Sequence, residues 1–408
     1  MNRLFGDHGC QEGDVALKSQ EKFRAASIAL VTSAAVMLSG CGVSPSASSQ
    51  QSSQHVTEAG KAPARTRTAG TPVAHNGKDP HLLYLKMFNQ HDGWGVYYRA
   101  VLHTVNGWRT WAEVNPPGVR PISNQAVYFG SPRHAWLAAK GKHHSLTIWY
   151  TYDGGVRWRE YTVIPPFAVG TGGTFFSFLS SKDGWLLVNG FPALAASPEA
   201  LYRTSDGGQR WTLVRNYGRQ NIMDIRFLTN RVGYERGGDA NGGMGSLFYT
   251  HDGGWSWSPV RIPVLSQKID SKLPKVVLTQ GPVFFGSQYG VVPVASVVGT
   301  NYRRAGLLRT VNGGHTWTLG STKTKPDSFG VMFSLLSQNA LIMGVPLPLN
   351  HGVTFFISRD LGRNWTYLGR TEEPLSSIQF LSPTLGWALT SNGLPVITKD
   401  GGSKWNAG

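Results

Sequence analysis

The side chains that could do chemistry in this chain are few, and they stand at spacings that build no familiar active site. Only two cysteines occur, Cys10 and Cys41, which excludes a disulfide scaffold and a zinc site made of cysteines. The pair His143 and His144 has no third metal ligand at a useful spacing and favours a polar loop. Of the glutamates in the chain, Glu235 is the best candidate for a catalytic carboxylate. We therefore predict no catalytic residue, no metal site and no cofactor.

The chain is strongly basic, with 39 Lys and Arg against 23 Asp and Glu and a formal charge of +16. This balance favours anionic partners, such as an acidic protein segment or an anionic membrane surface. Hydrophobic residues make up 40% of the chain and charged residues 15%, so a large core can form and wholesale disorder is excluded. Nucleic acid, another common partner of basic proteins, is excluded by the export signal at the N-terminus.

The first forty residues predict export. Ala25–Leu38 is an apolar run preceded by basic residues, and it is typical of a signal peptide because it is too short to span a bilayer. The Leu-Ser-Gly-Cys sequence that ends at Cys41 resembles the lipobox of bacterial lipoproteins. That resemblance implies cleavage before Cys41 and a diacylglyceryl group on its sulfur. We expect residues 1–40 to be the signal peptide and the mature protein to be extracytoplasmic, lipid-anchored to the outer face of the cytoplasmic membrane.

Residues 41–80 predict a flexible tether, because they are rich in Ser, Gln, Ala, Thr and Gly and contain almost no large apolar side chains. The basic residues of this segment could rest on anionic headgroups or simply be solvated. Residues 1–17 are long and acidic for the start of a signal peptide, so translation beginning near Val15 or Leu17 is expected.

From residue 81 onward one pattern returns seven times: Ser or Thr, then Asp or Asn two residues later, then glycine, and Trp five residues after the Asp or Asn. Asp or Asn can accept backbone N–H groups in a tight turn, glycine supplies a positive φ, and Trp packs from the next strand. Trp108 and Leu361 each replace one glycine of a copy. The seven pairs are Asn106 and Trp111, Asp153 and Trp158, Asp206 and Trp211, Asp252 and Trp257, Asn312 and Trp317, Asp360 and Trp365, and Asp400 and Trp405.

A second signature precedes several copies: Phe, five residues, Gly and an aromatic residue, as in Phe178 to Gly184-Trp185. Variants with four intervening residues begin at Phe88 and Phe285, and the sixth copy retains only Phe333. With the turn motif, this signature predicts four strands per unit, the turn joining the third to the fourth. Dividing residues 81–408 by seven gives about 47 residues per unit. The sequence therefore predicts an all-β fold, a seven-bladed β-propeller of four-stranded antiparallel blades.

The last unit ends three residues after Trp405, which is short for a full outer strand. Its strands are expected at 377–381, 386–390, 394–398 and from Trp405 onward. We predict that residues 72–80 pair with this last blade and close the ring.

The turn motif resembles the Asp-box, or BNR repeat, of β-propellers. Together with the Phe and Gly-aromatic signature it looks like the photosystem II stability/assembly factor family, over residues 81–408. That resemblance implies an exported, lipid-anchored propeller that binds membrane-protein assembly intermediates without catalysing a reaction. An Arg three residues before the Asp-box acid is common in that family and is matched here by Arg203 and Arg309.

The loops opposite the Asp-box turns are the predicted binding face, because insertions on one face of a repeat protein usually mark the site of contact. Those loops carry more basic than acidic residues, which suits an acidic protein segment, a membrane-protein intermediate or an anionic membrane surface bound by a monomer. Solubilising charge is the alternative reading. The basic residues are Arg120, Arg215, Arg219, Lys268, Lys272, Lys275, Arg303, Arg304, Lys323 and Lys325.

A sialidase-like glycoside hydrolase, or a carbohydrate-binding propeller, is the rival interpretation, since Asp-boxes also occur in sialidases. Those enzymes resemble one another in needing three arginines around a sugar carboxylate, a Tyr nucleophile with a Glu partner, and an Asp acid/base. The run 260–263, Val-Arg-Ile-Pro, mimics their arginine motif but follows the fourth Asp-box instead of preceding the first. A clustered arginine triad with a Tyr/Glu pair would favour this rival.

Overall fold

The computed structural model describes residues 66–68, 74–76, 81–98, 100–116, 118–120, 126–191, 197–219, 222–238, 244–262, 275–278, 280–298, 301–320, 331–347 and 351–407. The chain divides into two units, Met1–Thr57 and Glu58–Gly408, and every described residue lies in the second. The expected signal peptide and Cys41 lie outside the described residues. In the described part all regular elements are strands, and no helix there could span a bilayer.

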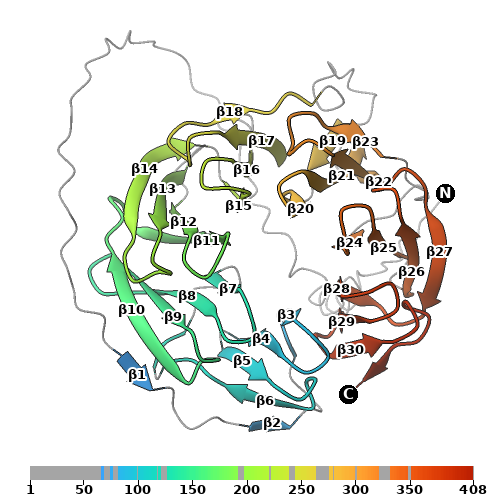
Figure 1. Ribbon diagram of the computed structural model, residues 1–408, viewed down its shortest axis with the longest axis horizontal. Helices are drawn as coiled ribbons and strands as arrows, with labels where there is room; N and C mark the ends of the chain where they lie inside the picture. Colours follow the sequence, from blue (N-terminus) through green and yellow to red (C-terminus); the bar gives the residue numbers. More distant parts are fainter. Residues whose placement is uncertain are drawn as a thin grey trace, which may run out of the picture. The chain divides into compact units, whose positions relative to one another are not determined.

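The strands form seven antiparallel sheets arranged as blades around a central axis (Figure 1). The chain is therefore a seven-bladed β-propeller, as the sequence predicted. Blade 1 consists of β3 (Tyr84–Met87), β4 (Gly93–Tyr97), β5 (Ala100–Thr104) and β6 (Thr110–Glu113). Blade 2 consists of β7 (Val127–Phe129), β8 (Ala135–Lys140), β9 (Leu146–Thr151) and β10 (Arg157–Val163). Blade 3 consists of β11 (Val169–Phe178), β12 (Gly184–Gly190), β13 (Ser197–Thr204) and β14 (Thr212–Arg219).

The later blades follow the same order, from an inner to an outer strand. In blade 5 two short segments, β19 and β20, both pair with β21 at the inner edge. Blades 4 to 7 consist of β15 (Asp224–Phe227), β16 (Gly233–Gly238), β17 (Met244–Thr250) and β18 (Ser258–Pro259); β19 (Lys275–Leu278), β20 (Val283–Phe285), β21 (Tyr289–Val298), β22 (Asn301–Thr310) and β23 (Thr318–Leu319); β24 (Met332–Leu335), β25 (Leu341–Pro346), β26 (Val353–Ser358) and β27 (Thr366–Thr371); and β28 (Leu375–Phe380), β29 (Gly386–Thr390), β30 (Pro395–Thr398) and β31 (Asn406–Ala407).

The described residues of the predicted closing segment 72–80 pair with blade 1 and not with blade 7, so that prediction is wrong for residues 74–76. Residues 74–76 form β2 (Ala74–Asn76), which pairs with β6 as an extra outer strand of blade 1. Residues 66–68 form β1 (Thr66–Thr68), which pairs with β10 at the outer edge of blade 2. Blade 7 has no vacant place, because β31 follows directly after its Asp-box turn and pairs with β30. The expected tether thus contains two short strands.

The hydrophobic core is divided among the seven seams between neighbouring blades. Each seam holds one cluster with residues of both blades, and each cluster contains or packs against one Asp-box tryptophan. Six of those indoles are at most 7% exposed, and the seventh, Trp405, is partly buried. The seam between blades 7 and 1 follows the same rule, with Trp387 and Leu389 packed among Leu85, Met87 and Trp111. The ring is therefore closed by the same side-chain packing that joins the other blades.

The Phe of the second signature pairs across the sheet with the Gly that follows it, and the register corrects three of its positions. Phe178 lies opposite Gly184, where an added Cβ would meet the phenyl ring at 2.3 Å. In blade 1 the equivalent residue is Met87, paired with Gly93, and not Phe88. In blade 5 it is Phe284 and not Phe285. In blade 6 the equivalent residue is Leu335, paired with Leu341, and not Phe333. The spacing is therefore five residues in these blades too.

Candidate functional site

The seven Asp-box turns share one hydrogen-bond pattern. The Ser or Thr hydroxyl donates to the Asp or Asn side chain at 2.8 to 3.1 Å. The same oxygen accepts the N–H four residues later, at 2.7 to 3.0 Å. The Asp or Asn oxygen in turn accepts the N–H four residues after itself. These bonds use the acid or amide internally, which makes the boxes a structural device.

Two consecutive residues in each turn have a positive φ, which explains the glycine pair. Gly207 and Gly208, for example, have φ of 77° and 96°. Trp108 and Leu361 adopt φ of 68° and 56° in the same places, although side chains disfavour this conformation. Both are buried in a seam, at 6% and 2% exposure, so packing stabilises what the backbone disfavours.

The Asp-box turns and the turns between the first and second strands lie at the same end of each blade. In all seven blades the N–H after the Asp or Asn donates to a carbonyl of that other turn, as from Gly154 to Arg133 at 3.0 Å. The loops between second and third strands, and the blade connections, therefore lie at the opposite end. We call the two ends the Asp-box end and the connection end.

The predicted basic face at the connection end is only partly within the described residues. Arg120 is exposed there. Arg215 lies in β14, and its guanidinium donates to the Trp255 carbonyl at 3.0 Å, so it points to an Asp-box turn and not to a connection loop. Arg219, Lys275, Arg303 and Arg304 are strand residues of β14, β19 and β22 and not loop residues, because these strands extend further than the sequence predicted. Lys268, Lys272, Lys323 and Lys325 lie outside the described residues.

The other residues singled out in the sequence lie on separate elements. Glu235 is 1% exposed within β16, and Arg261 is exposed at the surface. The Arg203 guanidinium lies over the Trp185 ring, 5.1 Å from its centroid, inside a seam. Arg309 stands at the same position before the Asp-box of blade 5, and burial lowers its pKa. No group of three or more potential metal ligands occurs in the described part of the chain.

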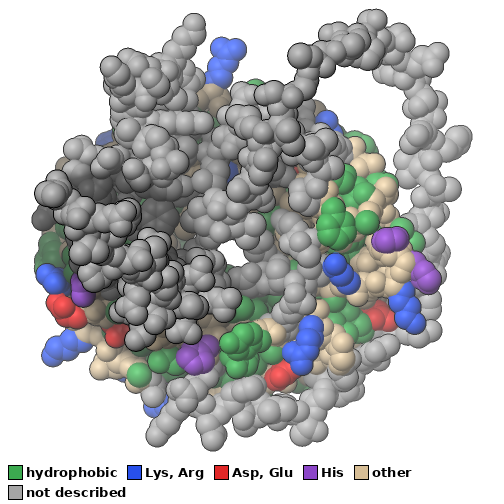
Figure 2. Space-filling model, turned by 180° about the vertical axis from the view of Figure 1, so that it is seen from behind, with side chains coloured by type: hydrophobic (Ala, Val, Ile, Leu, Met, Phe, Trp, Pro, Cys, Tyr) green, Lys and Arg blue, Asp and Glu red, His purple; other side chains and the backbone are tan. Residues whose placement is uncertain are grey.

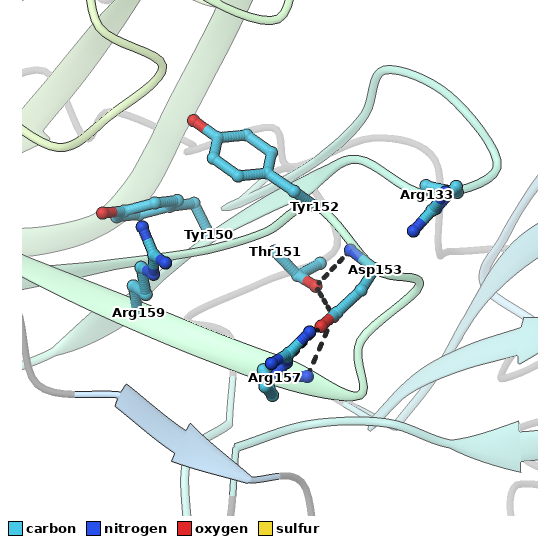
Figure 3. Close-up of a pocket in the computed structure, with 7 residues that line it drawn as sticks. All are labelled: Arg133, Tyr150, Thr151, Tyr152, Asp153, Arg157 and Arg159. Carbon is cyan, nitrogen blue, oxygen red and sulfur yellow. Dashed lines mark hydrogen bonds and ion pairs between the residues drawn. The ribbon is translucent and has the colours of Figure 1, made fainter.

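A pocket of about 350 Å³ lies beside the Asp-box turn of blade 2 (Figure 3). The turn between β7 and β8 contributes an arginine, β9 and the Asp-box turn contribute four residues, and β10 contributes two more arginines. Its seven lining residues are Arg133, Tyr150, Thr151, Tyr152, Asp153, Arg157 and Arg159. We call this the blade-2 pocket.

The one acid among the seven lining residues is already engaged. Asp153 accepts from Thr151 at 2.9 Å and forms an ion pair with the Arg157 Nε at 2.8 Å. Burial raises the pKa of Asp153, but the hydrogen bonds from Arg157 and Thr151 outweigh burial and leave the pKa below its usual value. The carboxylate is therefore charged at neutral pH, and it neutralises one of three arginines. The pocket keeps an excess of positive charge.

The two tyrosines are held as neutral phenols. Burial raises the pKa of Tyr152 to about 12, and its hydroxyl donates to the Gly207 carbonyl of blade 3 at 2.8 Å. Burial also raises the pKa of Tyr150, against the opposing effect of Arg159, which lies beside it (Figure 3). Such phenols can give hydrogen bonds but are poor nucleophiles. The pocket is suited to holding an anion and offers no activated group to attack one.

The sequence carried a signal for this pocket that our prediction missed. Arg157 and Arg159 flank Trp158, and alternate strand residues point to opposite faces. Because Trp158 is buried in the seam with blade 1, the two arginines emerge together on the face toward blade 3. The prediction instead assigned binding to the connection end, where the loops are longer.

Solved structures with low sequence identity share this fold. An oligogalacturonate lyase from Vibrio parahaemolyticus aligns with a TM-score of 0.54 and 9% identity, over 82% of this chain and 97% of that chain. A GH74 xyloglucanase from Xanthomonas campestris aligns with a TM-score of 0.52 and 11% identity, over 84% of this chain. This chain spans 54% of the xyloglucanase.

The chain is also similar to YCF48 from Cyanidioschyzon merolae, with a TM-score of 0.46 and 16% identity, over 69% of this chain and 83% of that chain. A structure of YCF48 bound to D1 peptide aligns with a TM-score of 0.45 and 18% identity, over 69% and 80% of the two chains. No protein-family model and no curated protein matches the sequence. At these identities the likenesses describe the fold alone.

Proposed function

We propose that this protein is a non-enzymatic binding module whose blade-2 pocket holds the carboxylates of an acidic protein segment. The observation that carries the proposal is the composition of the pocket: three arginines, two neutral phenols and one acid that is already paired. Arginine binds carboxylates through parallel N–H groups. The neutral Tyr150 hydroxyl adds a donor beside them, whereas the Tyr152 hydroxyl already donates to the Gly207 carbonyl. The formal charge of +16 would attract such a segment from a distance.

An arginine cluster with tyrosines is also what the rival, a sialidase-like hydrolase, requires. However, no glutamate lines the blade-2 pocket, and the burial that raises the pKa of Tyr152 to about 12 disfavours a phenolate nucleophile. Asp153 is bound by Thr151 and Arg157, so it is not available as an acid or base. These features favour capture of a carboxylate over hydrolysis. An acidic sugar that is bound without turnover is the second candidate.

The proposal includes export and anchoring through Cys41, which rests on the apolar run 25–38 and the residues that precede the cysteine. The partner would then be an acidic segment of a protein at the outer face of the cytoplasmic membrane. Mass spectrometry of the protein isolated from its host is expected to show a chain that begins at a diacylated Cys41. A retained residue 1–40 or an unmodified Cys41 would contradict the anchoring.

The binding proposal is tested with a fluorescent peptide of alternating Asp and Gly, titrated with the purified full chain. Each exposed charge pair is worth about 0.2 to 1 kcal/mol, so replacing both Arg133 and Arg159 by Gln is expected to weaken binding about tenfold. Arg231→Gln is the matched control, because the carbonyls of Arg133 and Arg231 accept equivalent Asp-box N–H groups in blades 2 and 4. The control should bind like the wild type.

Equal affinity in the double variant and in Arg231→Gln would remove the blade-2 pocket from the proposal. Titration with sialic acid and with a galacturonate oligomer separates the second candidate. Stronger binding of either sugar than of the peptide would favour a carbohydrate ligand, and release of a product would establish the rival enzyme.

A further inference from the structure

The Asp-box end of the ring carries many exposed cations, and every turn of that end lies within the described residues. Ten Lys and Arg residues occur in these turns, and all ten side chains are exposed. They come from every blade except blade 5. The ten are Arg109, Arg133, Arg157, Lys182, Arg210, Arg231, Arg359, Arg363, Lys399 and Lys404.

The acids of the same end are more enclosed than the cations. There are seven, so the formal excess at this end is three positive charges, and six of the seven are half-buried. Each accepts a hydrogen bond from a side chain of its own turn, as when Asp92 accepts from Asn89 at 2.8 Å. A partner that approaches this end therefore meets positive charge first. The seven are Asp92, Asp153, Asp183, Asp206, Asp252, Asp360 and Asp400.

Exposed apolar side chains lie in the same turns, at equivalent places in different blades. Val156 and Trp255 each stand three residues after the acid of an Asp-box and are 58% and 63% exposed. Two further places, between the Thr and Asn of a box and directly after the residue that pairs with the signature glycine, hold exposed apolar residues as well. They are Val105 and Val311, and Leu179, Phe285 and Leu381.

Trp255 has no role in the core, because the structural indole of its box is Trp257, which is 7% exposed. The turn that carries Trp255 is nevertheless well held. The Arg215 guanidinium of blade 3 donates to the Trp255 carbonyl at 3.0 Å, and the Arg231 Nε donates to the His251 carbonyl at 3.2 Å. A firmly held turn thus presents a large apolar side chain to solvent.

These cations and apolar side chains share one level of the ring. In all seven blades the same N–H of the Asp-box turn donates to the same carbonyl of the neighbouring turn, at 2.8 to 3.0 Å. Equivalent turns that are repeated around a central axis lie at equal heights along it (Figure 1). The Asp-box end is therefore a broad surface to which almost every blade contributes. A peptide would touch a few of these turns, whereas a flat partner can touch them all.

We propose that the Asp-box end is a docking surface for an anionic phospholipid bilayer. A Lys or Arg near such a surface contributes a factor of about five in affinity. Tryptophan favours the boundary between headgroups and hydrocarbon, and apolar side chains beside cations strengthen binding there.

This inference goes beyond the proposed function, and only the role of the anchor rests on it. A diacylglyceryl group on Cys41 would hold the protein at the membrane without fixing which end of the ring faces the lipid. The docking surface would fix that orientation. The blade-2 pocket contains Arg133 and Arg157 of the same end, so an acidic segment of a membrane protein would meet the pocket beside the headgroups.

The test is co-sedimentation with vesicles made of equal parts of phosphatidylglycerol and phosphatidylcholine, compared with vesicles of phosphatidylcholine alone. The chain used begins at Glu58, because residues 58–408 contain all seven blades and the contacts that close the ring. It lacks Cys41 and the apolar run 25–38, which would insert into lipid by itself. We expect binding to the anionic vesicles that weakens as salt is added, and little binding to the neutral ones.

Replacing Arg109, Arg210 and Lys399 by Gln together removes three exposed cations from three blades and leaves the blade-2 pocket intact. Affinity for the anionic vesicles should fall at least tenfold. Lys and Arg side chains also lie elsewhere around the ring (Figure 2), so the control must remove equal charge from the connection end. That matched control replaces three exposed cations of blade connections and of the β8–β9 loop by Gln, and it should bind nearly as the wild type does. Its three residues are Arg120, Lys142 and Arg261.

The apolar contribution is tested by Trp255→Ser, which should weaken binding to the anionic vesicles at least about threefold. Ile164→Ser is its control, because this side chain is 68% exposed and lies in the connection between blades 2 and 3. All the replaced side chains are exposed, so thermal unfolding should give each variant the Tm of the wild type.

Equal binding to the two kinds of vesicle, or an equal loss in the two triple variants, would overturn the proposal. If the vesicles show no difference but the Asp and Gly peptide binds more weakly to the first triple variant than to its control, this end serves an acidic protein and not a bilayer. Vesicle binding by this chain requires neither Cys41 nor peptide capture. The docking surface and the proposed function can therefore fail separately.

Discussion

At the scale of single residues, the Asp-box turn needs the shape of its acid more than its charge. Asn106 and Asn312 accept the same hydrogen bonds as the five aspartates. Charge adds strength where further donors face the carboxylate. Burial raises the pKa of Asp252, but the hydrogen bonds from Ser256 and Thr250 outweigh it and lower the pKa to about 2. Turns with identical backbones therefore respond differently to acid.

Asp252→Asn should make the protein less stable than the wild type at neutral pH, by an amount that disappears in acid. A carboxyl whose pKa is lower in the folded than in the unfolded state contributes stability above its unfolded pKa of about 3.9. That contribution is lost as the pH falls through the folded value of about 2. Urea unfolding of both proteins between pH 6 and 2 measures the difference. A difference that stays constant over this range would show that the charge of Asp252 plays no part.

At the scale of strands and seams, one substitution compensates for another between blades 5 and 6. In blades 2, 3 and 4 the aromatic residue of the second strand donates to the Asp-box of the next blade, as when Trp136 donates to the Gly207 carbonyl at 2.9 Å. Blade 5 has Val291 at this place, and blade 6 has Leu361 where the first glycine of its box would stand. Both side chains belong to the same core cluster. Leu361 thus occupies volume that an indole would otherwise fill.

A double-mutant cycle tests this compensation. Leu361→Gly alone should destabilise the protein by about 1 to 2 kcal/mol, because the lost burial of about 2 to 3 kcal/mol exceeds the relief of the left-handed backbone. Val291→Trp alone should cost about 1 to 3 kcal/mol through overpacking. Together they recreate the arrangement of Trp136 and Gly207, so their combined cost should fall short of the sum by at least about 1 kcal/mol. Additive costs in urea unfolding would refute the compensation.

The sequence predicted the turns of each blade more accurately than the registers or the pocket. The seven Asp-box turns were found because their hydrogen bonds require particular residue types, which repeat at fixed spacing. The register of blade 1 was misassigned because packing against the glycine needs a large apolar side chain, and Met87 satisfies it as well as Phe. In blade 5 two phenylalanines are adjacent, Phe284 and Phe285, so residue type alone did not select the one that pairs with the glycine. The blade-2 pocket was missed because its arginines lie on separate elements, Arg133 on a turn and Arg159 on β10.

At the scale of the whole molecule, the ring is closed where its two ends meet, between blades 7 and 1. Gln379 of β28 accepts the Met87 N–H at 2.9 Å and donates to the Met87 carbonyl at 2.6 Å. The Trp387 indole packs edge-on against Trp108 at 6.1 Å in the same seam. No strand of blade 1 belongs to the sheet of blade 7, so these contacts carry the closure together with the Leu82 N–H, which donates to the Gly393 carbonyl at 2.7 Å, and the apolar packing of the seam. In the other seams, the two blades follow one another directly along the chain.

Gln379→Met should therefore open this seam before any other. The substitution keeps the length of the side chain but leaves both polar groups of Met87 without their partner, at a cost of about 2 kcal/mol. Hydrogen exchange should accelerate in β3 and β28 while the seam between β11 and β15, held by Ser177, stays protected. Gln209→Met is the control, since its single bond to the Asp206 carbonyl lies at the surface. Equal acceleration in all seams would mean that closure is distributed around the ring, and that the contacts between its two ends have no special part in holding the molecule together.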